Sequence, residues 1–157
     1  MPKALKEGDP APSIHVADDQ GQPFDLAQLK GKQVVLYFYP KADTPGCTKE
    51  AQGFSENSKK FAKAGAVILG VSPDKPAALA KFKEKYKLPF ALLSDVDHKV
   101  AEAYGTWVEK SMYGRTYMGV ERSTFLIGKD GKIKQIFRKV KPDRHATEVC
   151  QVLQEAE

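Results

Sequence analysis

Cys47 combines a reactive side chain with surroundings that favour reactivity. It follows residues 40–46, a short polar segment between a predicted buried strand and a predicted helix. Thr44 suits the N-cap of that helix and Pro45 its first position, so Cys47 would lie in the first turn, beside unpaired backbone N–H groups. A buried structural cysteine is the alternative, but it fits these polar neighbours poorly. We interpret Cys47 as a nucleophile.

A cation is expected to support such a thiol. The thiolate is the reactive form, and lowering a thiol pKa from about 8.5 to about 6 takes roughly 3.4 kcal/mol. A helix dipole contributes at most about 2 kcal/mol. Arg122, just before the apolar run Thr124 to Ile127, is the candidate cation because a guanidinium stays charged and donates several hydrogen bonds.

The second cysteine, Cys150, has the surroundings of a structural residue. It shares a helical stripe with Ala146, Val149 and Leu153, which favours a small core residue. No CxxC pattern occurs, and the three histidines have no metal-ligand spacing to one another or to the cysteines. We therefore expect reduced thiols and no metal site.

Composition limits the class of protein. A chain of 157 residues with 41% hydrophobic content suits a single domain spanning residues 1–157. No apolar run resembles a signal peptide or a membrane span, so we expect a cytoplasmic protein that binds no membrane. The net charge is +5, but the lysines of residues 81–87 split between helix faces without interleaved aromatic residues, so we expect no nucleic-acid binding.

The hydrophobic pattern predicts alternating strands and helices. The unalternating run Val34 to Tyr39 indicates a strand buried on both faces, residues 44–64 have helical spacing, and Ala66 to Val71 forms a second strand. Further along, the pattern predicts a helix from Pro76, a short strand at residues 90–93, helical turns at 100–104, a hairpin at 124–137 and a helix from near Asp143.

This order indicates an α/β, thioredoxin-like fold, with a central mixed sheet flanked by helices. Residues 8–12 and 18–23 are rich in turn formers and form an N-terminal extension.

Several motifs together resemble the peroxiredoxins, and within them the Q-type, or bacterioferritin comigratory protein, group. Pro40, Thr44 and Cys47 match the signature Pro-x-x-x-Thr-x-x-Cys. The other matching stretches are Gly8-Asp9-Pro10-Ala11-Pro12, Val71-Ser72-Pro73-Asp74, Leu93-Ser94-Asp95, Lys110-Ser111-Met112-Tyr113-Gly114 and Glu121-Arg122-Ser123-Thr124-Phe125. They extend over almost the whole chain.

The resemblance implies reduction of hydrogen peroxide and small organic hydroperoxides, with no cofactor. It implies that Cys47 is the peroxidatic cysteine, Thr44 a hydroxyl partner of the peroxide, Pro40 a shield of the pocket and Arg122 the thiolate-stabilising cation. Glu50 resembles the acidic residue that orients the arginine, but it also reads as a helix-surface carboxylate.

The chain departs from many relatives at the resolving cysteine. Gln52 stands five residues after Cys47, and residues 79–86 contain no cysteine either. We expect an external thiol such as thioredoxin, glutaredoxin or glutathione to reduce the Cys47 sulfenic acid. Two alternatives remain: resolution by Cys150, and a redox-sensing binding module with little turnover. The resemblance favours a monomer.

Overall fold

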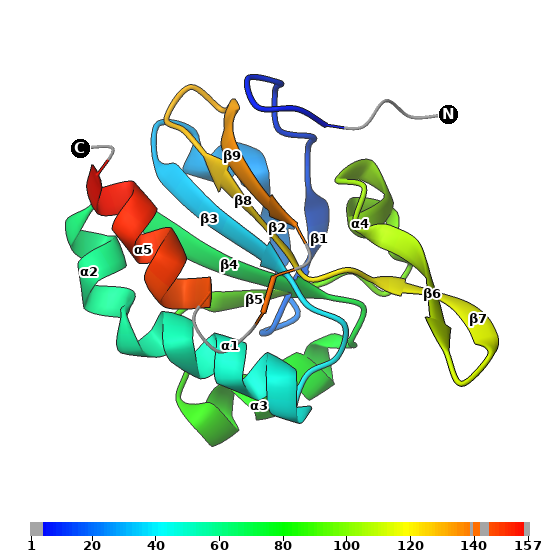
Figure 1. Ribbon diagram of the computed structural model, residues 1–157. Helices are drawn as coiled ribbons and strands as arrows, with labels where there is room; N and C mark the ends of the chain where they lie inside the picture. The colour runs from blue at the N-terminus through cyan, green and yellow to red at the C-terminus, as the bar shows by residue number, and fades with distance from the viewer. Residues whose placement is uncertain (1–4, 139, 142–144, 156–157) are drawn as a thin grey trace.

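The apolar run Val34 to Tyr39 forms most of β3 (Gln33–Phe38), an inner strand of the sheet in the computed structural model, which describes residues 5–138, 140–141 and 145–155 (Figure 1). The elements are, in chain order, β1 (His15–Asp18), β2 (Pro23–Asp25), the 3-10 helix η1 (Leu26–Leu29), β3 (Gln33–Phe38), α1 (Pro45–Glu56), α2 (Ser58–Lys63), β4 (Ala66–Ser72), α3 (Pro76–Tyr86), β5 (Ala91–Ser94), α4 (Lys99–Ala103), β6 (Trp107–Met112), β7 (Arg115–Val120), β8 (Ser123–Ile127), β9 (Ile133–Arg138) and α5 (His145–Glu155).

Seven strands form one mixed sheet in the order β2-β1-β5-β4-β3-β8-β9. The pairs β3–β4 and β4–β5 are parallel, and the remaining neighbours are antiparallel. The predicted thioredoxin-like arrangement, with a central mixed sheet flanked by helices, is confirmed. The predicted hairpin is confirmed as β8–β9. The residue predicted to start the last helix, Asp143, lies outside the described residues.

Both faces of β3 are buried, as predicted from its continuous run of apolar residues. Val35, Tyr37 and Tyr39 pack into the core beneath α1, α2, α3 and α5. Alternate residues, such as Leu36 and Phe38, pack into a second core that α4, η1 and the N-terminal segment cover. The sheet is therefore a rigid layer between two apolar cores, and the loops at its strand ends are held at fixed positions.

The helix predicted over residues 44–64 is two helices, because Asn57 ends α1. Its side-chain amide donates to the Gly53 backbone oxygen at 2.8 Å, and its backbone N–H also bonds to Gly53. Asparagine competes in this way with regular helical bonding. The backbone then starts again as α2, with Asn57 as its N-cap.

The N-terminal extension contains two strands that the sequence did not predict. β1 and β2 pair with each other, and β1 adds to the sheet beside β5. The turn between them fits the predicted turn-rich segment: Asp18 Oδ1 accepts hydrogen bonds from the N–H groups of Gln20 and Gln22. Strands of three or four residues are too short to show a clear period.

The β6–β7 hairpin was also missed, and it protrudes from the body of the molecule (Figure 1). Its two-residue turn is Tyr113-Gly114, and both residues have positive φ angles, 53° and 76°. A glycine between two runs of equal length is the sequence signal of such a turn.

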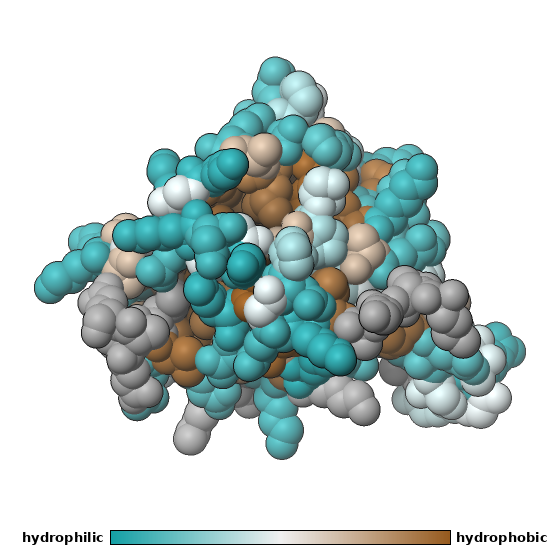
Figure 2. Space-filling model, turned by 90° about the horizontal axis from the view of Figure 1, so that it is seen from above, coloured by the Kyte–Doolittle hydropathy of each residue, from teal (hydrophilic) through white to brown (hydrophobic). Residues whose placement is uncertain are grey.

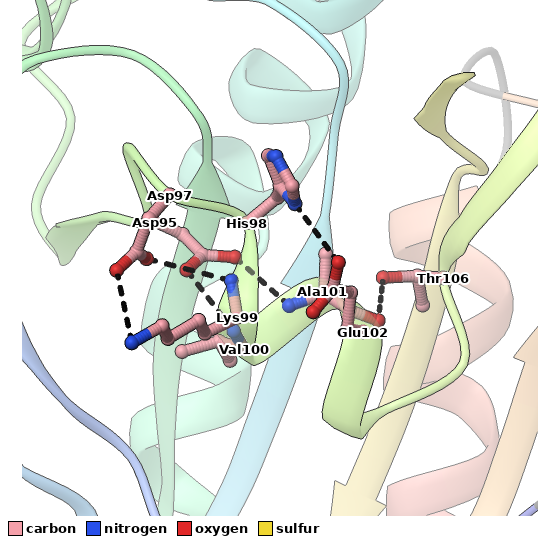
Figure 3. A network of polar contacts seen from close by, with 8 residues as sticks. All are labelled: Asp95, Asp97, His98, Lys99, Val100, Ala101, Glu102 and Thr106. Atoms are coloured by element: carbon pink, nitrogen blue, oxygen red, sulfur yellow. Dashed lines mark hydrogen bonds and ion pairs between the residues drawn. The ribbon is translucent and has the colours of Figure 1, made fainter. Parts of the chain in front are cut away.

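Asp95 fixes the start of α4, which covers the second core (Figure 3). The Asp95 carboxylate accepts hydrogen bonds from the backbone N–H groups of Val100 at 3.0 Å and Ala101 at 2.8 Å. Thr106 donates to the Ala101 oxygen at 3.2 Å and thereby ties the end of α4 to the base of β6. The Leu93-Ser94-Asp95 stretch therefore has a structural role here.

An apolar cavity lies at the beginning of β3. It has a volume of about 230 Å³ and is lined mainly by apolar residues, including Leu26, Leu29, Val34 and Ile127. Figure 2 shows apolar side chains in a hollow on the upper face of the molecule. Cys47 follows the opposite end of β3, so this cavity is not part of its site. Within the described residues, no helix is long and apolar enough to cross a membrane.

Candidate active site

Cys47 is the third residue of α1, and its side chain is only 1% exposed. Thr44 has the extended backbone of an N-cap and Pro45 begins the helix, as predicted. The Thr44 hydroxyl makes no cap hydrogen bond but donates to the Lys41 backbone oxygen at 2.8 Å. The first-turn N–H groups therefore have no side-chain cap, which leaves the positive end of the helix open to an anion near Cys47.

Asp74 holds the loop of residues 40–44 that leads to Cys47. Its carboxylate accepts hydrogen bonds from the Ala42 N–H and from the Ser72 hydroxyl, each at 2.7 Å. Asp74 follows β4, which lies parallel to β3, so it ties the ends of two neighbouring strands together. Sequence reasoning did not identify this anchor. A carboxylate just beyond a predicted strand, beside the strand that leads to Cys47, is the signal that points to it.

Arg122 lies between β7 and β8 and contacts Glu50, which is one turn after Cys47 on α1. Its Nη1 donates to Glu50 Oε1 at 3.3 Å. The Glu50 side chain is fully buried and that of Arg122 is 18% exposed. Glu50 therefore does not lie on the helix surface, and the structure brings together two of the residues that the sequence singled out.

Burial governs the ionisation of the groups around Cys47. It raises the pKa of Glu50 to about 7, although the Arg122 charge and hydrogen bond act in the opposite direction. It also raises the pKa values of Tyr37 and Tyr39, so both phenols stay neutral. The two tyrosine hydroxyls and Glu50 Oε2 have no hydrogen-bond partner among the described residues. Cys47 is thus surrounded by neutral or half-ionised polar groups, with Arg122 as a nearby cation.

Lys110 of β6 belongs to the same neighbourhood. Burial is the main cause that lowers the pKa of Lys110, and the positive charge of Arg122 lowers it further. Glu121 and Cys47 act in the opposite direction. Because Arg122 and Cys47 both influence the ionisation of Lys110, the Lys110 side chain lies within electrostatic reach of each. In the sequence, Lys110 stood out only as part of a motif. Its position near the site depends on the β6–β7 hairpin, which the sequence did not predict.

Pro40 is the first residue of the loop that leads to Cys47 and is half-buried, directly after the fully buried Tyr39. Tyr39 packs against α3 through Phe82, with ring centroids 6.1 Å apart. Pro40 therefore lies at the junction between the core and the loop before Cys47.

Cys150 lies on α5, in the same core as Cys47 but away from it. Helices α1 and α5 meet at Gly53, where an added Cβ would be 3.2 Å from the Ala146 Cβ. Cys47 precedes Gly53 by six residues, about 9 Å along the helix axis. Cys150 lies one turn after Ala146 on α5, which also contacts α2, and Lys60 of α2 influences its ionisation. A disulfide requires Cα atoms within about 7 Å, so joining the two cysteines would need a rearrangement.

Burial also raises the pKa of Cys150, which keeps this thiol protonated and a poor nucleophile. Among the residues that the structure describes, no group of three or more histidine, cysteine, aspartate or glutamate side chains could hold a metal ion.

Comparison with known families identifies the chain. The model of the AhpC/TSA family matches residues 7–136. The chain belongs to this family. It is 49% identical to peroxiredoxin Bcp of Bacillus subtilis over 151 residues, covering 96% of each chain. It is 47% identical to peroxiredoxin Bcp of Escherichia coli K12 over 151 residues, covering 96% of this chain and 97% of the relative. The resemblance to Q-type peroxiredoxins is confirmed.

Solved structures agree with this assignment. A cysteine-to-serine mutant of PrxQ from Xylella fastidiosa superposes with a TM-score of 0.92 at 34% identity, covering 99% of both chains. Peroxiredoxin Q from Xanthomonas campestris gives a TM-score of 0.86 at 40% identity, covering 90% of both chains. The thioredoxin-like fold predicted from the sequence is therefore that of solved peroxiredoxins.

Proposed function

We propose that this peroxiredoxin reduces hydrogen peroxide and small organic hydroperoxides through a Cys47 sulfenic acid, which an external thiol then reduces. The placement of Cys47 carries the proposal: it lies in the first turn of α1, and Glu50, one turn later on the same helix, is paired with Arg122. Relatives support it, since one solved structure of the Xanthomonas campestris bacterioferritin comigratory protein was determined to explain alkyl peroxide reduction.

The first step is a two-electron oxidation of Cys47. The thiolate attacks the terminal peroxide oxygen, an S–O bond forms and the O–O bond breaks. The leaving hydroxide or alkoxide takes a proton from solvent to become water or an alcohol, and the sulfenic acid keeps the proton of the attacked oxygen. Arg122 donates to the thiolate and to the peroxide oxygens. The Thr44 hydroxyl donates its hydrogen bond to the Lys41 oxygen, so its lone pairs are left to accept a hydrogen bond from the peroxide O–H. Pro40, without an N–H group, shields the pocket.

Glu50 has a positioning role in this scheme. Its Oε1 accepts from Arg122 and fixes the guanidinium beside α1. Because the Glu50 carboxyl is only partly ionised near neutral pH, it orients Arg122 without cancelling the whole of its charge.

The second step uses a thiol from outside the chain. Gln52 is exposed on α1, α3 has no cysteine, and Cys150 lies beyond the Gly53–Ala146 contact. A reductant thiol attacks the sulfenic sulfur and releases water, which gives a mixed disulfide. A second thiol then releases Cys47 and leaves as the oxidised disulfide. Thioredoxin, glutaredoxin and glutathione are the reductants to compare, and the chain acts as a monomer in the cytoplasm.

Trapping the sulfenic acid tests the first step. Wild type, Cys47→Ser and Cys150→Ser proteins are treated with one equivalent of peroxide and a 1,3-dione probe, and the labelled residue is located by mass spectrometry. We expect labelling at Cys47 in the wild type and in Cys150→Ser, and none in Cys47→Ser. Labelling that persists in Cys47→Ser, or none in any protein, would show that the proposal is wrong.

A further inference from the structure

Cys47 is buried just after the loop that leads to it. The thiol is 1% exposed, and Ala42 of the loop packs against the same core as Cys47. A small peroxide needs little room, whereas a thiol reductant must bring its sulfur into line with the Cys47 sulfur. The loop of residues 40–44 must therefore move before an external thiol can react.

Three side chains hold this loop against α3. Asp43 accepts a hydrogen bond from the Tyr86 hydroxyl at 2.8 Å. Both Asp43 carboxylate oxygens also accept from Lys85 Nζ, at 3.2 and 3.0 Å. Lys85 Nζ in turn lies 5.3 Å from the centre of the Tyr86 ring. We refer to Asp43, Lys85 and Tyr86 as the α3 clamp.

The backbone at Asp43 depends on these contacts. Its φ angle is 59°, in the left-handed region that residues other than glycine rarely adopt. Such a conformation persists when neighbouring contacts hold it. The other anchor, Asp74, lies just after β4 and holds the neighbouring residue, Ala42. Loss of the clamp would therefore release the part of the loop nearest Cys47 while its start stays fixed.

A groove gives the released loop room to move. It lies between residues 41–43 and α3, has a volume of about 690 Å³ and has Ala78 and Phe82 among its lining residues. Phe82 contacts both Tyr39 and Tyr86, so the groove begins where the core ends.

We propose that the α3 clamp positions the loop over Cys47 and that its opening admits the external thiol. This inference rests on the proposed function, because it assumes resolution from outside the chain. The clamp has the right strength for a reversible gate: the Asp43 and Lys85 side chains are 46% and 59% exposed, and exposed ion pairs contribute little to stability. It holds the closed state yet breaks easily.

The test uses Tyr86→Phe and Lys85→Met in a Cys150→Ser background, where Cys47 is the only thiol of the chain. Tyr113→Phe, which changes a tyrosine that is 96% exposed, and Lys59→Met, at an exposed position on α2, are the matched controls. Three rates are measured: modification of reduced Cys47 by a bulky aromatic disulfide, reduction of its sulfenic acid by glutathione, and its oxidation by hydrogen peroxide. Urea unfolding gives the global stability of each protein.

Tyr86→Phe is expected to accelerate the bulky reagent and the glutathione step about fivefold, the size expected for one hydrogen bond. Lys85→Met is expected to accelerate both about two- to fivefold, the size expected for an exposed ion pair. Oxidation by hydrogen peroxide should change less than twofold, and the controls should match the parent. Unchanged reagent rates in both clamp variants would overturn the inference, as would rates that merely follow global unfolding. The reagent arm needs no peroxide, so a failure of the clamp is distinguishable from a failure of the peroxidase proposal.

Discussion

Glu50→Gln is expected to become steadily more stable than the wild type as the pH rises from 4.5 to 7. Glu50 is fully buried, and burial raises its pKa from 4.5 to about 7. The folded protein then holds this proton more tightly than the unfolded chain does. The resulting stabilisation is complete below pH 4.5 and is lost as the pH rises through 7.

The size of the effect follows from the two pKa values. The difference between about 7 and 4.5, at about 1.36 kcal/mol per pKa unit, corresponds to about 3 kcal/mol. Glutamine has nearly the same shape as glutamic acid and does not titrate. The variant therefore keeps the stability that the wild type loses as Glu50 ionises. The free energy of unfolding of Glu50→Gln, minus that of the wild type, should therefore grow by about 3 kcal/mol over this range.

His145 masks this effect in the wild type, which is why the difference between two proteins is the quantity to measure. His145 is buried between Phe54 and Phe137, and its Nε2 lies 2.6 Å from the Thr124 hydroxyl. Burial lowers its pKa from 6.5 to about 4. The unfolded chain binds this proton more tightly, so stability rises with pH between 4 and 6.5. The two residues have opposite slopes, and the wild type profile should be nearly flat.

Urea unfolding at pH 4.5, 5.5, 6.5 and 7.5 measures the difference. Glu56→Gln, at the exposed end of α1, is the control and should follow the wild type at every pH. A constant difference between Glu50→Gln and the wild type would refute the reasoning that burial, and not Arg122, dominates the ionisation of Glu50.

Three further variants test the site and its supports. Arg122→Ala should slow oxidation of Cys47 by peroxide about 10- to 100-fold, the value of a charged hydrogen bond, as measured by stopped-flow fluorescence; a rate within twofold of the wild type would remove Arg122 from the step. Gln52→Cys should form a disulfide with Cys47 after oxidation and lower the yield of sulfinic acid, as seen by mass spectrometry, provided that α1, which holds both residues, unwinds to bring them within disulfide distance; an unchanged yield of sulfinic acid would show that α1 does not unwind. Gly70→Ala should cost about 1–3 kcal/mol in urea unfolding, because its Cβ would lie 2.9 Å from Tyr37 and Leu92; wild type stability would contradict this packing.

Strand β3 and its loop were predictable because their signals are local. Val34 to Tyr39 is an unalternating apolar run, and Thr44, Pro45 and Cys47 follow the local rules for a helix start. The β6–β7 hairpin was missed because its strands are partly exposed and lack a strong apolar run. The break at Asn57 was missed because one side-chain hydrogen bond decides it.

The contacts that complete the site are not local. Glu50 and Arg122 are 72 positions apart, and only the family resemblance joined them before the structure did. Asp43 and Tyr86 are 43 positions apart, and nothing in the spacing of either residue points to the other. Such pairs depend on the order of strands in the sheet, which places α3 beside the loop that follows β3.

Steady-state peroxide consumption with an external thiol tests the central claim most directly. Wild type, Cys47→Ser and Cys150→Ser proteins are compared with thioredoxin, glutaredoxin and glutathione as reductants. We predict that Cys150→Ser turns over at the wild type rate with at least one of these reductants and that Cys47→Ser is inactive. A Cys150→Ser protein that forms the Cys47 sulfenic acid normally but stalls with every reductant that supports the wild type would contradict resolution from outside the chain.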